Sequence, residues 1–146
     1  MDHFIIRECT AKDVNAIYEL NSKELGYDFP IKSTQKQLGK ILLDGTQKIF
    51  VAVRQGSVVG YIHLNSYDVL YFEHLKNIMG IAVFSEFKRN GIGKKLLQIG
   101  EKWAQEDGAI GIRLVSGAER TDAHQFYLKC GYIGNKLQKN FKKVFN

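Results

Sequence analysis

Four cations flank two glycines in a short turn that leads from an apolar segment into an amphipathic one. A helix that begins in such a turn presents unpaired backbone N–H groups and a partial positive charge at its N-terminus. Glycine lets a ligand approach that backbone closely, and the cations strengthen the attraction for anions. The pattern therefore favours a phosphate-binding turn. Its members are Lys88, Arg89, Gly91, Gly93, Lys94 and Lys95.

Two common phosphate motifs are excluded. No Gly-x-x-x-x-Gly-Lys-Ser/Thr segment occurs, so the turn is not a Walker loop. Gly91 and Gly93 are not followed by a third glycine, which argues against a dinucleotide-binding fingerprint. Taken alone, the segment also fits a tight strand-to-helix turn with solvated lysines.

The elements on either side must position this turn. Residues 77–84 are predicted as a strand, and Gly80 inside it indicates a bulge or a close backbone approach. Residues 91–107 are predicted as a helix, because apolar side chains recur on one side at helical spacing. These side chains are Leu96, Leu97, Ile99, Trp103 and Ala104.

Two further helices are predicted near the N-terminus. Thr10 is the expected N-cap of a helix over residues 11–25, with Asp13 in its first turn. Ser33 or Thr34 is expected to cap the second helix. The residues that this helix is expected to bury are Leu38, Ile41 and Leu42.

Alternating and β-rich segments predict the strands. Residues 66–75 either extend a hairpin or form a loop. Thr121 is expected to cap a last helix, which Gly131 ends. Strands are expected at residues 3–8, 48–54, 57–65, 77–84, 110–116, 131–134 and 140–145.

This order of elements predicts an α/β (α+β) fold. We expect a single domain over residues 1–146, with a mixed, largely antiparallel central sheet flanked by about four helices. The connection between residues 84 and 110 is long enough for a right-handed parallel crossover.

Composition narrows the class of protein. The 146 residues are 45% hydrophobic and 25% charged, as in an ordinary globular domain, and no apolar run is long enough to span a membrane. The N-terminal residues lack the pattern of a secretory signal, so a cytoplasmic location is expected. Cys9 and Cys130 have no metal-ligand spacing and are interpreted as free thiols; no metal is expected.

Two motifs in this order resemble the GNAT superfamily of acetyl-CoA-dependent N-acyltransferases. The first is the family's Arg/Gln-x-x-Gly-x-Gly/Ala turn, which Lys88 to Gly93 matches. The second is its Asn-x-x-Ala-x-x-Phe-Tyr segment followed by Gly-Phe/Tyr, which Arg120 to Tyr132 matches. The resemblance covers nearly the whole chain and is closest to small single-domain bacterial members.

The resemblance implies where acetyl-CoA, the acyl donor, would bind. Pantetheine would pair with the backbone of Ile81 and Val83, and the pyrophosphate would lie on the amides from Arg89 to Lys94. Arg120 could bind a CoA phosphate or pair with Glu119 or Asp122. The full set of expected cofactor-binding residues is Ile81, Ala82, Val83, Lys88, Arg89, Asn90, Gly91, Ile92, Gly93, Lys94, Arg120 and Phe126.

The same resemblance makes Tyr127 the expected catalytic residue, facing the CoA sulfur. A phenol has a pKa of about 10 and a thiol about 8.5, so a hydrogen bond to the developing thiolate is favoured over full proton transfer. The reaction implied is direct attack of a neutral amine on the acetyl thioester, which requires a proton acceptor.

The proton acceptor stays open. Asn77 stands where many family members have a glutamate base, and an amide cannot take a proton. The alternatives are a residue near the site or no protein base at all. The candidate bases are Glu73, His74, His63 and His124, and Glu24 and Tyr27 are candidate contacts of the acceptor.

The expected function is therefore transfer of an acetyl group to a primary amine of a small molecule or protein. A non-catalytic acyl-CoA-binding or regulatory domain is the alternative, because of Asn77. The net charge of +6 is also compatible with a nucleic-acid-binding protein. Binding of the CoA phosphates, together with a solvated tail over residues 136–143, explains this charge better. The identity of the acceptor and the oligomeric state stay open, with a homodimer as one option.

Overall fold

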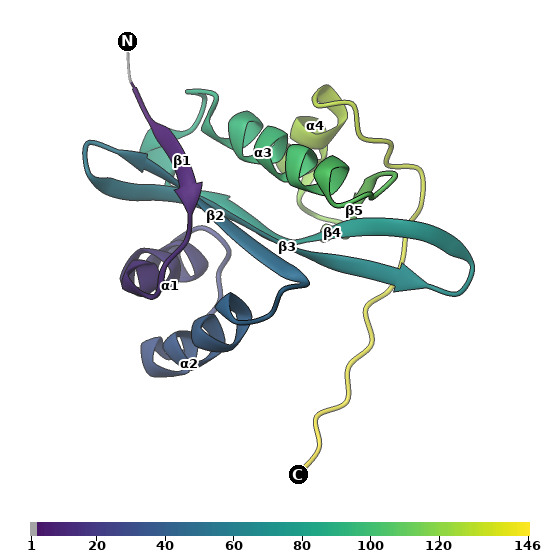
Figure 1. Ribbon diagram of the computed structural model, residues 1–146, viewed down its shortest axis with the longest axis horizontal. Helices are drawn as coiled ribbons and strands as arrows, with labels where there is room; N and C mark the ends of the chain where they lie inside the picture. Colours follow the sequence, from purple (N-terminus) through teal and green to yellow (C-terminus); the bar gives the residue numbers. More distant parts are fainter. Residues whose placement is uncertain (1–2) are drawn as a thin grey trace. The chain divides into compact units, whose positions relative to one another are not determined.

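A computed structural model describes residues 3–146 (Figure 1). The chain divides into two compact units, one ending at Leu114 and the other spanning Val115–Asn146.

The first unit is built on a five-stranded sheet in the order β1-β2-β3-β4-β5. Neighbouring strands are antiparallel except for β4 and β5, which are parallel. The predicted mixed, largely antiparallel sheet is therefore confirmed, and residues 66–75 extend the hairpin. The strands are β1 (Ile5–Glu8), β2 (Gln47–Arg54), β3 (Ser57–Val69), β4 (Phe72–Val83) and β5 (Ile112–Leu114).

Helices cover both faces of this sheet (Figure 1). The helices α1 (Val14–Lys23) and α2 (Ile31–Leu42) lie on one face, where Leu20 and Leu38 pack in a buried cluster with Val51 of β2. The helix α3 (Ile92–Glu106) lies on the other face. Short 3-10 turns precede α1 and α3, at η1 (Ala11–Asp13) and η2 (Ser85–Phe87).

The predicted bulge lies beside Gly80. Leu64 of β3 is opposite Ile78, whereas His63 is opposite Gly80, so Met79 is an extra residue in β4. A β-carbon on Gly80 would lie 3.4 Å from the Tyr61 hydroxyl, which explains the small residue at this position. The bulge reverses the side-chain alternation of β4 at the point where its pairing with β5 ends.

The helix caps test the local predictions. Thr10 and Asp13 form the predicted N-terminal cap as a capping box, with the Thr10 amide donating to the Asp13 carboxylate over 2.9 Å. The predicted cap at Ser33 or Thr34 is wrong, because α2 begins at Ile31 after Pro30. Thr34 is instead buried inside the helix, and its hydroxyl donates to the Pro30 carbonyl oxygen over 3.1 Å.

Other predicted details are also corrected. Leu42 is 37% exposed, whereas Leu38 and Ile41 of the same helix pack on the buried cluster. The strand predicted at residues 110–116 is reduced to β5, whose partner strand bulges after Ile78.

The second unit contains one helix, α4 (Thr121–Lys129). Thr121 begins this helix instead of capping it, and the cap position is held by Arg120 without a side-chain hydrogen bond. Gly131 follows with a φ of 91°, as predicted for a helix stop. The strands predicted at residues 131–134 and 140–145 are wrong, since this segment pairs with no strand in the described part of the chain.

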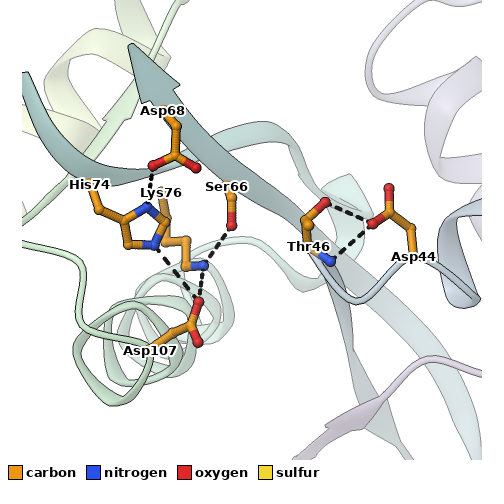
Figure 2. Close-up of polar contacts among 7 residues, drawn as sticks. All are labelled: Asp44, Thr46, Ser66, Asp68, His74, Lys76 and Asp107. Carbon is orange, nitrogen blue, oxygen red and sulfur yellow. Dashed lines mark hydrogen bonds and ion pairs between the residues drawn. The ribbon is translucent and has the colours of Figure 1, made fainter. Parts of the chain in front are cut away.

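A buried lysine joins α3 to the hairpin of β3 and β4 (Figure 2). The Lys76 side chain is 0% exposed, donates to the Ser66 hydroxyl over 2.8 Å and pairs with Asp107, the residue that ends α3. Its ammonium also lies 4.1 Å from the centre of the Trp103 ring. His74 lies between Asp68 and Asp107, with Nδ1 2.8 Å from Asp68 Oδ1. A buried ammonium is stable here because carboxylate, hydroxyl and ring all contact it.

We expect Asp107→Ala to lower the thermal unfolding midpoint by roughly 10 °C, because it leaves the Lys76 ammonium buried without its carboxylate. Lys76→Met should have a much smaller effect, since it removes the buried charge and keeps most of the packing volume. Differential scanning calorimetry of both variants and of the double variant checks this. If the Lys76 variant were the less stable one, the ion pair would be a net source of stability.

Candidate active site

The backbone of β4 is open along one edge. The strand β5 pairs with β4 only at Lys76, Asn77 and Ile78. In the described residues up to Leu114, no strand pairs with β4 on that side from Met79 onward. The two parallel strands therefore part at the bulge and leave the rest of the β4 edge to another partner.

The alternating hydrogen-bond pattern between β3 and β4 identifies which backbone groups of β4 face this open edge. The Phe84 amide donates to the Val59 carbonyl oxygen over 2.9 Å, so Phe84 is bonded to β3. Antiparallel pairs alternate between bonded and non-bonded positions, and Ala82 lies two residues before Phe84 on β4. The N–H and C=O groups of Ile81 and Val83 therefore point away from β3, toward the open edge.

The strand leads directly into the cationic turn. Arg89 and Gly91 both adopt left-handed backbone, with φ of 67° and 81°. For arginine this conformation costs about 1–2 kcal/mol, whereas glycine adopts it freely. The two reversals turn the chain sharply from η2 into α3.

The N-terminus of α3 is left uncapped. Gly91 holds the cap position and offers no side chain, and the first turn contains no acidic residue. The first hydrogen bond of this helix runs from the Lys95 amide to the Gly91 carbonyl oxygen over 3.0 Å. The preceding amides of the helix are thus free of intrahelical partners. Lys94 and Lys95 are exposed beside them, so the turn can hold an anion as predicted from the sequence.

Glu24, at the end of α1, contacts the segment that leads into the cationic turn. Its carboxylate accepts from the Ser85 amide and hydroxyl over 3.0 and 2.8 Å, and Lys88 Nζ lies 3.5 Å away. Burial opposes ionisation of this carboxyl, but the Ser85 hydrogen bonds and the Lys88 charge outweigh it and lower its pKa. Glu24 is therefore placed as a support of the turn, and Tyr27, the other acceptor candidate, is 63% exposed.

In the second unit, Tyr127 lies on α4 beside two aromatic rings. The ring centres of Phe126 and Tyr132 are 5.4 and 5.9 Å from that of Tyr127. Burial raises the pKa of the Tyr127 phenol, and the nearby Arg120 charge only partly offsets this. The group therefore stays a neutral hydrogen-bond donor. Arg120 forms no ion pair with Glu119 or Asp122 in the described part of the chain.

Comparison with known proteins shows which family this chain belongs to. The profile of the acetyltransferase (GNAT) family matches residues 14–132. The chain belongs to this family. It is an acetyl-CoA-dependent N-acetyltransferase, as the resemblance of its two motifs implied.

Individual relatives agree with this assignment. An aminoalkylphosphonate N-acetyltransferase of Salmonella typhimurium is 29% identical over 87% of this chain and 83% of its own length. A streptothricin acetyltransferase of Escherichia coli is 24% identical over 90% of this chain and 71% of its own. The structure of an aminoglycoside N-acetyltransferase, AAC(6')-Iy, solved with CoA, has the same fold. Its TM-score is 0.88, at 17% identity, over 98% of this chain and 96% of that one.

The histidines of this GNAT chain are not brought together. His63 lies on β3, 2.7 Å from the Gln47 Oε1 atom, and burial lowers its pKa to about 4. His74 is engaged by two aspartates on the α3 side of the sheet, and the adjacent Glu73 is exposed. In the second unit, His124 Nε2 lies 2.9 Å from the Gly117 carbonyl oxygen. Each of the three histidines thus has a structural partner.

Sequence reasoning missed one group of side chains. Arg113 of β5 donates to the Asn77 Oδ1 atom over 2.6 Å and stacks on the Tyr67 ring, with 4.3 Å from guanidinium carbon to ring centre. The cross-strand neighbour of Asn77 is Asn65, whose buried Oδ1 atom has no hydrogen-bond donor in the described residues. No motif contains Arg113, and only the pairing of β4 with β5 brings it to Asn77.

We expect Lys94→Glu to raise the dissociation constant of acetyl-CoA at least about tenfold, because it places a carboxylate where an anion would bind. The variant should unfold at the same or a higher temperature, since a negative charge stabilises a helix N-terminus. Lys102→Glu, on the exposed face of the same helix, is the matched control. Isothermal titration and thermal melts separate the effects; unchanged affinity in Lys94→Glu would move the phosphates away from this turn.

Proposed function

We propose that this enzyme transfers the acetyl group of acetyl-CoA to the primary amine of a small molecule by direct attack. The observation that carries the proposal is the open edge of β4, which runs from the bulge at Met79 to the cationic, uncapped start of α3. An extended amide chain ending in phosphates fits such an edge and such a turn. The named small-molecule acceptors of the two curated relatives support a small amine as the acceptor.

The residues of this chain would hold the donor in two places. The outward-facing backbone groups of Ile81 and Val83 would pair with the pantetheine amides. The amides at the start of α3, with Lys94 and Lys95 beside them, would hold the pyrophosphate. When bound, acetyl-CoA supplies an activated thioester: the amine nitrogen forms a C–N bond to the acetyl carbon, the C–S bond breaks, and CoA leaves as the thiolate.

Tyr127 is proposed to stabilise that thiolate. Its raised pKa makes full proton transfer to a thiolate more uphill than for a free phenol, so the hydroxyl acts by hydrogen bonding. A hydrogen bond to a charged group contributes about 1.5–3 kcal/mol. The protonated amine formed in the attack supplies the proton that balances the release of thiol.

The amine must arrive neutral, and His63 cannot take its proton. The pKa of an alkylammonium is about 10.4 and that of His63 is about 4, so the transfer is uphill by roughly 9 kcal/mol. His74 and His124 are occupied by other contacts. We therefore propose that the enzyme selects the neutral fraction of the amine from solution, and that orientation next to the thioester provides most of the acceleration.

The direct test of the function is an assay of CoA thiol release with a panel of primary amines. We expect release above acceptor-free hydrolysis with at least one small amine, and an N-acetyl product in the mass spectrum. Hydrolysis alone across the whole panel, or acetylation confined to protein lysines, would contradict a small-molecule acceptor.

For Tyr127→Phe we expect kcat to fall about 10- to 100-fold, the equivalent of one hydrogen bond to a charged group. The affinity for acetyl-CoA should stay nearly unchanged, because the hydroxyl contributes mainly in the transition state. Tyr71→Phe, at the exposed tip of the β3–β4 hairpin, serves as the control. Wild-type turnover in Tyr127→Phe would remove this hydroxyl from the mechanism.

The pH dependence of kcat/KM tests the absence of a protein base. We expect it to rise about tenfold per pH unit from pH 6 to 9, following the neutral fraction of the amine. His63 stays neutral through this range, because its pKa of about 4 lies below it, so His63→Gln should leave the slope unchanged. An inflection in this profile that is lost in His74→Ala or His124→Gln would identify that histidine as the base.

A further inference from the structure

The α1–α2 face of the sheet changes from apolar to polar near the bulge. Closer to the helices, this face carries buried Val51 and Tyr61. Further along β3 and β4, most side chains on the same face are polar, and Leu75, opposite Tyr67, is apolar. The polar ones are His63, Asn65, Tyr67 and Asn77, joined by Arg113 of β5.

Arg113 is the charged member of this group. Its side chain is half-buried, held between the Asn77 amide oxygen at 2.6 Å and the Tyr67 ring at 4.3 Å. No carboxylate pairs with it in the described part of the chain. Lys48 of β2, another half-buried cation of the sheet, has a carboxylate partner, Glu8, at 2.8 Å. A guanidinium held by neutral groups retains its full attraction for an anion.

This anion cannot be the pyrophosphate of the donor. Arg113 lies opposite Asn77 in the sheet, and the pyrophosphate turn begins after Val83. The six residue-to-residue steps from Asn77 to Val83 span about 20 Å of strand. Arg113 instead lies at the last paired residues before β4 and β5 part, beside the start of the open edge where the thioester end of the donor would lie.

We propose that Arg113, oriented by Asn77 and Tyr67, binds an anionic group on the acceptor. The acceptor class is then a small primary amine that also carries a carboxylate or phosphate-type group. The inference rests on the proposed function. It also gives Asn77 a role: a carboxylate at this position would neutralise Arg113, whereas the amide orients the guanidinium and leaves its charge available.

The test compares pairs of acceptors that share a carbon skeleton, one with the anion and one without it, at equal concentrations of the neutral amine. β-Alanine is paired with β-alaninamide, and O-phosphoethanolamine with ethanolamine, in the assay of CoA thiol release. We expect the anionic member of at least one pair to have a kcat/KM at least about tenfold higher, mainly through KM. The pair that shows the preference distinguishes a carboxylate from a phosphate ligand.

Three variants assign the preference to the residue. Arg113→Met keeps the stacking volume on Tyr67 and removes the charge, so the ratio of kcat/KM between the anionic and the neutral member should fall at least about tenfold. Asn77→Asp supplies an internal partner for Arg113 and should weaken the preference in the same direction. Lys36→Met, on the exposed side of α2, removes a cation away from Arg113 and should leave the preference for the anionic amine unchanged. Thermal melts confirm that each variant is folded.

The outcomes separate the two proposals. Equal use of anionic and neutral amines, or a preference that persists in both Arg113→Met and Asn77→Asp, would overturn the anion site while acetyl transfer stands. Absence of transfer to any amine by the wild-type enzyme would overturn the proposed function and this inference together.

Discussion

The structure depends on one constraint in β4: this strand is paired on both sides only up to Ile78. At Met79 a bulge interrupts its ladder with β3, and beyond Ile78 its pairing with β5 stops. Backbone polar groups need partners, so a strand released on one side becomes a binding edge. The open edge proposed to hold the donor, the turn that follows it and the proposed acceptor site all lie on or next to this strand.

Two separate regions of positive charge lie along β4. The turn at its end combines helix amides with lysines and suits a large, exposed anion. The Arg113 group before the bulge is half-buried and uses one oriented guanidinium, which suits a small ligand. In the proposed arrangement, this separation along the strand lets a phosphate-bearing donor and a charged acceptor bind different cations.

The opposite face of the sheet shows the structural use of charge. Lys76 and Asp107 fasten the end of α3 to the hairpin, as Figure 2 shows, and the ammonium there is fully enclosed by its partners. On the same strand, Arg113's partner Asn77 is only one residue away from Lys76. Adjacent residues of a strand point to opposite faces, so a satisfied cation and an available one are separated by the thickness of the sheet.

The sequence by itself determined the features that depend on residues close together in the chain. The capping box at Thr10, the left-handed glycines at 91 and 131 and the bulge next to Gly80 follow from local backbone preferences. The cationic turn was also predicted from local sequence. Together with the Tyr127 segment, it carried the resemblance to the GNAT family, to which the family profile assigns the chain. Local patterns gave wrong predictions where strand formation depends on a partner strand. The strands expected after residue 131 have no partner strand in the described residues.

Only the tertiary structure decided which distant side chains meet. Glu24 and Ser85 are 61 residues apart in the chain, and Arg113 and Asn77 are 36 apart. Neither pair belongs to a motif, because the sheet register and the helix packing that join them arise from the whole fold. The function of a guanidinium depends on what surrounds it. Arg113 is one of many cations in the sequence, and only three-dimensional packing leaves it without a carboxylate partner among residues 3–146.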